Sequence, residues 1–215
     1  MDGNAKKTLK LSEALHDKEP GFRSAGNVDF LRFLMWLVLI MLAVRAFAFE
    51  PVRVEGPSMQ NTLQNGERCF VEKIGYLFAS PKQGDIVIIH FPGRENEAFV
   101  KRIVATAGQT VEVRKVSNEA SSSGAVMRVY VDGEPLDESA YEDTMLIDSI
   151  TRYNRITCEG AEDGVFTVPE GCIFVMGDHR TNSQDSRVVG AIPLSYVIGR
   201  VHGVVFPFKN IRKVS

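Results

Sequence analysis

The longest apolar stretch of the chain lies near its N-terminus. From Phe33 to Phe49 every residue is apolar except Arg45, and no polar position recurs at helical spacing before Arg45. As a helix this stretch would span about 25 Å, close to the ~30 Å hydrocarbon layer of a membrane. A helix buried in a soluble core would instead carry a polar face. The pattern therefore predicts one transmembrane helix over residues 28–49, which anchors the protein in a lipid bilayer.

A cleaved signal peptide is an alternative interpretation of this stretch, because Ala46-Phe47-Ala48 has the small-x-small form of a cleavage site. The long apolar run and the long tail before it favour a permanent anchor. Lysine and arginine residues are slightly more frequent before the apolar run than just after it. This bias predicts a cytoplasmic N-terminal tail over residues 1–27.

Beyond Glu50 the pattern changes to short runs of β-branched and apolar residues, separated by Gly, Pro and Asp. Period-two alternation within these runs is typical of strands that are buried on one face. The chain is therefore predicted to be mainly β: an antiparallel β-sheet domain over residues 50–215, preceded by the single helix. Segments 115–127 and 137–163 are predicted to be loops or an insertion at the edge of the sheet.

Composition narrows the function further. The 215 residues carry a net charge of −2, which gives no reason to expect a nucleic-acid partner. The three cysteines form no CxxC pair and no cluster with histidine at metal-ligand spacing, so neither a metal nor another cofactor is expected. Cys158 and Cys172 could form a disulfide outside the cytoplasm, but three buried thiols are slightly favoured.

Ser58 and Lys101 are the first candidates for chemistry. Ser58 follows Gly56-Pro57 in a predicted turn, and a serine hydroxyl is a weak nucleophile until a base removes its proton. If 99–104 is a strand, Lys101 shares an apolar face with Phe99 and Ile103. Burial would lower the pKa of its amine and allow it to act as the base. A lysine that reaches water at a sheet edge is the alternative.

A polar segment, 177–187, follows the apolar run 172–176 and holds two aspartates, two arginines and two serines. It could be a surface loop with Asp–Arg pairs of little energetic weight, or a polar wall that orients the lysine amine. Within this segment, the adjacent residues Asp178 and His179 also suggest a Ser-His-Asp set with Ser58. That set is disfavoured, because adjacent residues rarely supply both the base and its orienting partner.

Several segments, taken in this order, resemble the type I signal peptidases, a family of membrane-bound Ser-Lys proteases. The family's Ser-Met-x-Pro-Thr-Leu motif resembles Ser58-Met59-Gln60-Asn61-Thr62-Leu63, with Asn61 at the proline position. The strand motifs resemble Gln83-Gly84-Asp85-Ile86-Val87 and Lys101-Arg102-Ile103-Val104. The motif Gly-Asp-Asn-x-x-x-Ser-x-Asp-Ser-Arg resembles residues 177–187, with His179 at the asparagine position.

This resemblance implies a role for each matching residue. Ser58 would be the nucleophile and Lys101 the general base. Ser183 would orient the lysine amine, while Asp185 and Arg187 support the site. The oxyanion hole and the substrate-binding surface would be formed by Ser58, Gly56 and Met59. Some family members have an oxyanion-hole serine where this chain has Gly56, so backbone N–H groups would form the hole here.

The resemblance also implies the substrate and the location. The expected activity is removal of signal peptides from secretory preproteins after small residues, by a domain outside the cytoplasm at the cell membrane. A catalytically inactive, membrane-tethered β module that acts as a binding partner is the alternative, suggested by the departures at Asn61 and His179. A self-cleaving repressor-type Ser-Lys protease is a third option. The N-terminal anchor disfavours it, because those proteins carry a DNA-binding domain instead.

Overall fold

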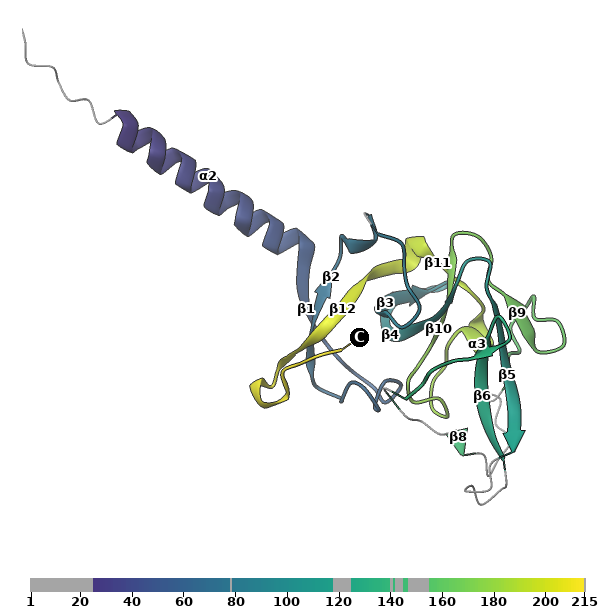
Figure 1. Cartoon of the computed structure of the whole chain (residues 1–215). Helices are drawn as coiled ribbons and strands as arrows, with labels where there is room; N and C mark the ends of the chain where they lie inside the picture. The colour runs from purple at the N-terminus through teal and green to yellow at the C-terminus, as the bar shows by residue number, and fades with distance from the viewer. Residues whose placement is uncertain are drawn as a thin grey trace, which may run out of the picture. The chain divides into compact units, whose positions relative to one another are not determined.

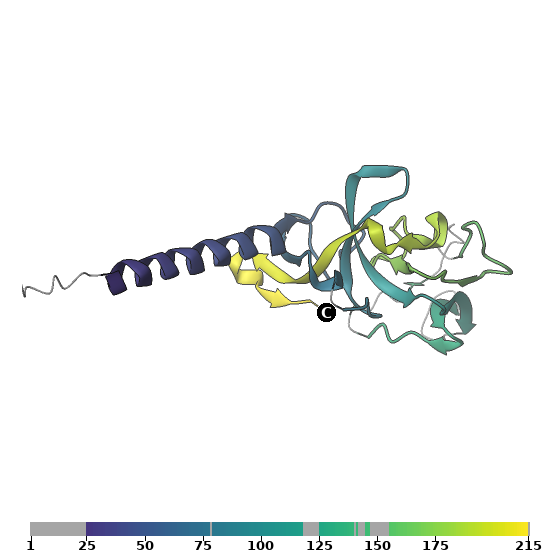
Figure 2. The same cartoon turned by 90° about the horizontal axis from the view of Figure 1, so that it is seen from above.

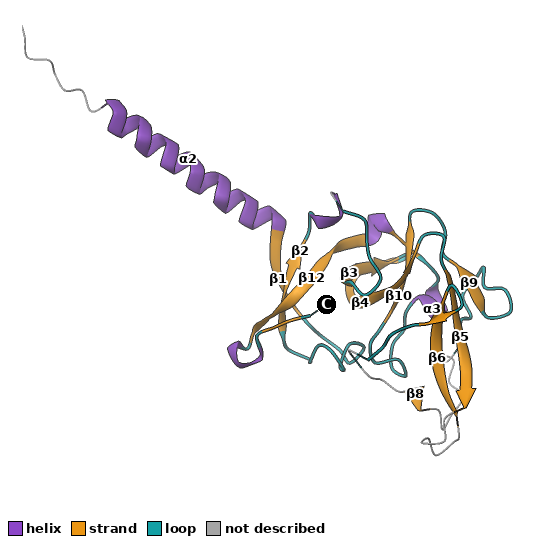
Figure 3. Cartoon of the chain, in the orientation of Figure 1, coloured by secondary structure: helices purple, strands orange, loops and turns teal. Residues whose placement is uncertain are grey.

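The computed structural model describes residues 25–77, 79–117, 125–139, 141, 145–146 and 155–214 (Figure 3). The chain divides into two compact units, Met1–Arg45 and Ala46–Ser215. Most of the predicted tail, residues 1–24, lies outside the described residues. Figure 3 shows that the described part of the second unit is built from strands and loops, with only short helical turns.

Helix α2 (Ala25–Ala48) occupies the predicted apolar stretch. It begins three residues before the predicted start, and it ends at Ala48 because Phe49 already pairs with Glu72 in a strand. The large apolar side chains from Val28 to Val44 are between 37% and 62% exposed, so they are not part of a folded core. Within the described residues, no helix combines the length and the apolar character needed to cross a membrane.

The second unit contains an eight-stranded antiparallel sheet within the described residues, called here the large sheet. In pairing order its strands are β1 (Phe49–Arg53), β2 (Arg68–Glu72), β12 (Val197–Phe206), β3 (Ile86–Phe91), β4 (Arg94–Thr106), β10 (Cys172–Met176) and β11 (Ile192–Pro193), with β13 (Arg212–Lys213) beside β12. This confirms the prediction of a mainly β, antiparallel fold for the chain beyond Glu50.

A second sheet of five strands, the small sheet, forms within the described residues from the middle of the chain. Its strands are β7 (Glu134–Pro135), β6 (Ala125–Val131), β5 (Thr110–Ser117) and β9 (Val165–Thr167), with β8 (Met145–Leu146) beside β6. Figures 1 and 2 show β5 and β6 on the side of β10 that faces away from β1 and β2. The short helical turns are η1 (Gly75–Leu77), α3 (Ser186–Val189), η3 (Leu194–Tyr196) and η4 (Phe208–Asn210).

Strand β4 places two neighbouring cationic side chains on opposite faces of the large sheet. Lys101 pairs with Val87 of β3, and Arg102 pairs with Met176 of β10. Because side chains alternate along a strand, the two cations point in opposite directions. The face of Lys101 carries an apolar cluster, formed by Val87, Ile89, Phe91, Ile103, Ile173, Val175 and Ile192. The large sheet thus buries a lysine within one of its apolar layers.

The two segments predicted to be loops are more ordered than the sequence indicated. Within 115–127, β5 continues to Ser117 and β6 begins at Ala125, so only residues 118–124 lie outside the description. Within 137–163, the side chains of Tyr141, Ile156 and Cys158 are buried, and the last two belong to an apolar cluster. Isolated apolar residues in an acidic stretch give no strand pattern, which is why the sequence did not reveal this packing.

All three cysteines are free. Cys69 and Cys158 are buried, whereas Cys172, at the start of β10, is half-buried.

Candidate active site

Lys101 is buried, with 2% of its surface exposed, and its Nζ donates a hydrogen bond to Ser183 Oγ at 3.0 Å. Burial penalises the ammonium form and lowers the pKa of Lys101 to about 8, although the carboxylate of Asp185 opposes the shift. This arrangement confirms the prediction of a buried lysine and excludes the sheet-edge alternative. At pH 7 roughly a tenth of this amine is therefore neutral, compared with well under a thousandth for an exposed lysine.

The polar segment 177–187, which follows β10 and is called here the polar wall, is largely buried and is not a surface loop. Asp185 and Arg187 are both fully buried, and Asp185 accepts hydrogen bonds from Arg187 Nε and Nη2 at 2.8 Å each. The other role of Asp185 is to cap α3, where its side chain accepts from the backbone N–H of Arg187. Burial alone would raise the pKa of Asp185, but the attraction of the Arg187 guanidinium lowers it overall. The carboxylate is thus ionised and holds the wall in place.

The turn that carries Ser58, residues 57–63 and called here the serine loop, is held against the same wall. Within it, Gln60 N donates to Pro57 O at 3.0 Å and Leu63 N donates to Met59 O at 2.7 Å. From the wall, His179 N donates to Ser58 O at 3.0 Å. These bonds fix the backbone of Ser58 to the segment that ends β10.

Gly177 lies against both the backbone carbonyl of Ser58 and the side chain of Ser183. A Cβ atom built on Gly177 would lie 2.3 Å from Ser183 Oγ and 2.5 Å from the carbonyl oxygen of Ser58. Only a residue without a side chain permits this close approach. Ser183 also accepts the hydrogen bond of Lys101, so the hydroxyl that binds the lysine amine lies on one side of Gly177 and the backbone of Ser58 lies against the same glycine. Ser58 and Ser183, which the sequence motifs assign to one site, are 125 positions apart in the chain.

The predicted oxyanion-hole residues differ in what their backbones can donate. Gly56 has a φ of +90°, and its N–H donates to Asn65 Oδ1 at 3.2 Å, so this N–H is already engaged. Among the described residues, the N–H of Ser58 has no acceptor. Pro57 has no N–H at all. The N–H of Met59 has no acceptor among the described residues either, so the unengaged backbone donors of the predicted set are those of Ser58 and Met59.

A groove of about 160 Å³ opens beside Ser58. Its lining comes from β1, from the chain around the serine loop, and from β3 and β4: Val52, Arg53, Val54, Glu55, Gly56, Ser58, Met59, Ile88, Ala98, Phe99 and Val100. Gly56, Ser58 and Met59, the three residues predicted to bind substrate, all contribute to this lining. Seven of the eleven lining residues are apolar, and Arg53 and Glu55 add one charge of each sign.

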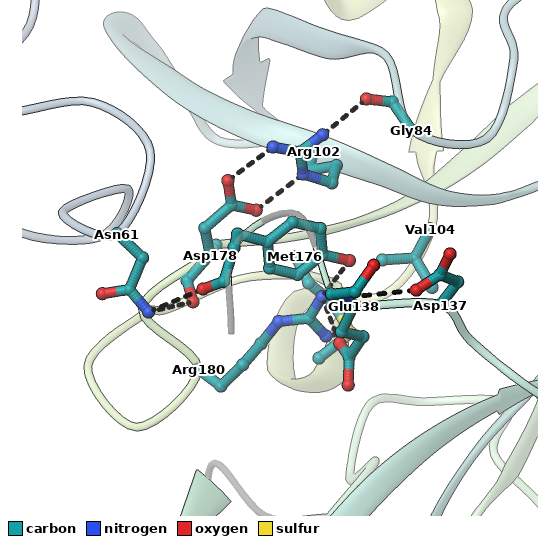
Figure 4. A network of polar contacts seen from close by, with 12 residues as sticks. Asn61, Gly84, Arg102, Val104, Asp137, Glu138, Met176, Asp178 and Arg180 are labelled. Atoms are coloured by element: carbon teal, nitrogen blue, oxygen red, sulfur yellow. Dashed lines mark hydrogen bonds and ion pairs between the residues drawn. The ribbon is translucent and has the colours of Figure 1, made fainter. Parts of the chain in front are cut away.

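A second buried ion pair supports the serine loop from the opposite face of β4. Arg102 Nε and Nη2 donate to the two carboxylate oxygens of Asp178 at 2.8 Å each (Figure 4). The same carboxylate accepts a hydrogen bond from the hydroxyl of Thr62, and Asp178 N donates to Met59 Sδ at 3.4 Å. The sequence indicates a role for Asp178 only in the disfavoured Ser-His-Asp set, and none for Arg102. Alternation along β4 signals that Arg102 faces away from Lys101, but nothing local identifies its partner.

The alternative Ser-His-Asp set is not formed. The carboxylate of Asp178 is occupied by Arg102 and Thr62, and the ring Nδ1 of His179 lies 3.2 Å from Pro57 O. His179 therefore contacts the backbone of the serine loop. Within the described residues, no group of three or more His, Cys, Asp and Glu side chains could hold a metal ion.

Comparison with known proteins gives this geometry its context. The family described as signal peptidase, peptidase S26, matches residues 27–206. A probable signal peptidase I-1 of Synechocystis sp. is 37% identical over 181 residues, which cover 81% of this chain and 80% of that protein. Signal peptidase I of Bacillus licheniformis is 35% identical over 194 residues, with 87% and 92% covered. Signal peptidase I T of Bacillus subtilis is 37% identical over 185 residues, with 83% and 84% covered. The resemblance found in the sequence motifs is confirmed, and the chain belongs to the signal peptidase family, peptidase S26.

Proposed function

We propose that this protein is a membrane-anchored serine endopeptidase that removes signal peptides from secreted preproteins, with Ser58 as nucleophile and Lys101 as general base. The observation that carries the proposal is the buried amine of Lys101. Its pKa is lowered to about 8, and it donates a hydrogen bond to Ser183, in the same segment that binds the backbone of Ser58. A surface lysine would be charged at neutral pH and could not accept a proton.

In the first half of the reaction, the neutral amine of Lys101 takes the proton of Ser58 Oγ as this oxygen attacks the carbonyl carbon of the scissile bond. Ser183 accepts a hydrogen bond from the amine, which leaves the nitrogen lone pair free for the incoming proton. The N–H of Ser58 stabilises the negative charge on the tetrahedral oxygen. Lys101 then donates its proton to the leaving amine of the mature protein. In the second half, Lys101 takes a proton from a water molecule that attacks the ester formed on Ser58. It returns this proton to Ser58 Oγ as the ester bond breaks and the signal peptide leaves with a new carboxylate.

The groove beside Ser58 supports the substrate part of the proposal. An extended signal peptide would lie there as an added strand, and small side chains before the scissile bond would fit its volume of about 160 Å³. The location is supported by the apolar run 33–49 and by the exposed apolar side chains of 28–44, which suit a bilayer. The N-terminus would then be cytoplasmic and the β domain extracytoplasmic.

The inactive binding module finds no support. The proposed nucleophile and base are both present, the lysine environment suits a base, and the related proteins are peptidases by name. Neither Asn61 nor His179 removes a reacting group.

The test is cleavage of a purified preprotein by the full chain in detergent micelles, with the new N-terminus identified by mass spectrometry. We expect cleavage after a small residue, and loss of cleavage when that residue of the substrate is changed to a bulky one. Ser58→Ala is expected to abolish the activity, whereas Ser80→Ala, at an exposed serine, serves as the matched control. Cleavage that persists in Ser58→Ala would refute the proposed nucleophile.

Gly177→Ala tests whether Ser58 and Ser183 must converge. The new methyl group would have to displace the side chain of Ser183 or the backbone of Ser58, because both lie under 3.0 Å from it. We expect kcat/KM to fall by about 100-fold, as for other small misplacements of a nucleophile. Gly199→Ala, in β12, is the matched control, since its Cβ would lie 2.5 Å from Glu72 O of the neighbouring strand β2, outside the serine loop. If both variants lose the same activity at temperatures below their Tm, general destabilisation explains the effect and the convergence does not matter.

A further inference from the structure

Position 61 lies within the serine loop, and its side chain fastens the loop to two other segments. Asn61 Nδ2 donates to Tyr141 O at 3.3 Å and to Asp178 O at 3.4 Å; the second of these contacts is visible in Figure 4. Among the described residues, the backbone N–H of Asn61 has no acceptor. The resembling motif has proline here, which restricts the backbone by its ring. Asn61 restrains the same position through its side-chain amide.

The residue that receives this amide comes from segment 137–163, which no motif of the family covers. Tyr141 is only 7% exposed, and its ring lies between two guanidinium groups, 4.4 Å from Arg102 and 5.3 Å from Arg180. Its hydroxyl also accepts a hydrogen bond from Arg180 Nη2 at 3.1 Å. A buried aromatic ring between two cations is held firmly, because the ring face attracts both of them.

Tyr141 therefore reaches the serine loop by two routes. The direct route is the bond from Asn61 to its carbonyl oxygen. The indirect route runs through Arg102, which the ring contacts and which holds Asp178, the partner of the Thr62 hydroxyl. Both routes end within four residues of Ser58.

We propose that Tyr141 is a positioning residue for Ser58, and that with Asn61 it restrains the serine loop where the family motif has proline. Tyr141 contacts no reacting atom; it acts through the loop and through Arg102. The inference rests on the proposed function, since it assigns this role relative to the proposed nucleophile. It also explains why a chain with Asn61 needs a buried tyrosine in an otherwise irregular segment.

The experiment compares Tyr141→Ala and Tyr141→Phe with Tyr130→Ala, in the full chain and with the preprotein assay. Tyr130 is a matched control, because it is half-buried in the small sheet and its ring lies 4.5 Å from the guanidinium of Arg114. We expect Tyr141→Ala to lower kcat by about 30-fold with KM changed less than about threefold, as expected for a misplaced nucleophile. Tyr141→Phe keeps the ring and should retain most of the activity. Tyr130→Ala should change kcat by no more than about twofold, because surface and half-buried sites distant from the loop contribute little.

Position 61 gives a second test of the same inference. Asn61→Ala should lower kcat, whereas Asn61→Pro should not, because proline removes no backbone hydrogen bond here and restrains the loop itself. In the Asn61→Pro background, Tyr141→Ala should cost less activity than in the wild type. An equal cost in both backgrounds would overturn the coupling between the two residues.

Hydrogen exchange separates this inference from the proposed function, because it needs no activity. The amides of Gln60, Thr62 and Leu63 are bonded within the serine loop, so their exchange reports its order. Tyr141→Ala should accelerate exchange in the peptide that contains 57–63, and Tyr130→Ala should not. Unchanged exchange, or a raised KM with unchanged kcat, would overturn the positioning role. If wild type fails to cleave preproteins while the exchange result holds, the proposed function is wrong and the restraint on the loop stands.

Discussion

Lys101→Met is expected to abolish preprotein cleavage while making the folded protein more stable at neutral pH. Methionine keeps the length and apolar contacts of the lysine side chain but has no group that accepts a proton. Loss of the general base should lower kcat/KM about a thousandfold or more. The gain in stability follows from burial. Lys101 is 2% exposed, and the pKa of its amine is lowered from 10.5 to about 8 because the charged form is poorly solvated.

The pH dependence follows from the same shift. Below pH 8 the amine is charged in both the folded and the unfolded chain, and its burial then costs about 3 kcal/mol. Between pH 8 and 10.5 the unfolded chain binds more protons, so the free energy of unfolding of the wild type rises with pH and the cost disappears. Lys101→Met should therefore be more stable by about 1–3 kcal/mol at pH 7, and this advantage should vanish near pH 10.5.

The activity of the wild type should follow the neutral amine. We expect kcat/KM to rise about tenfold per pH unit below pH 8 and to level off above it, since only the deprotonated lysine acts as base. Urea unfolding and preprotein cleavage, each followed from pH 6 to 10, measure the two curves. Lys115→Met removes an exposed lysine and should change neither. Cleavage that persists in Lys101→Met, or that is independent of pH, would mean that another group is the base.

The sequence predicts the parts of this molecule that depend on local pattern. Alternation places the longer strands of the large sheet, and the position of Lys101 between Phe99 and Ile103 indicates an amine on an apolar face. The motif spacing also predicts that Ser58, Ser183 and the Asp185–Arg187 pair belong to one site. In each case a residue's immediate neighbours, or a motif of a few positions, carry the information.

The contacts that hold the serine loop could not be predicted in this way. Arg102 and Asp178 are 76 residues apart, and only the pairing of β4 with β10 brings them together. Tyr141 lies in an acidic stretch with no period, so its burial depends on two arginines from other segments. Sequence patterns report which face of an element is buried; they do not report which distant charge will be found on that face.

Breaking the Arg102–Asp178 pair should destabilise the protein more than any exposed ion pair could. Arg102→Met leaves the fully buried carboxylate of Asp178 without its cation, which typically costs about 3–5 kcal/mol. The double variant Arg102→Met/Asp178→Asn removes both charges and should recover a large part of that loss. Urea unfolding at pH 7 measures the three free energies.

Arg114→Met is the matched control, because Arg114 pairs with Glu112 at 2.6 Å on a largely exposed surface. Such pairs contribute about 0–1 kcal/mol, since water solvates both partners when they separate. The buried pair differs because the carboxylate of Asp178 has no water to replace the guanidinium.

If Arg102→Met costs no more than Arg114→Met, water must reach Asp178 in the variant. If the double variant is no more stable than Arg102→Met, the loss comes from the packing of the arginine against Tyr141 and not from the unpaired charge. The expected order of stability is therefore Arg114→Met above the double variant and the double variant above Arg102→Met, because only the last buries a charge without a partner.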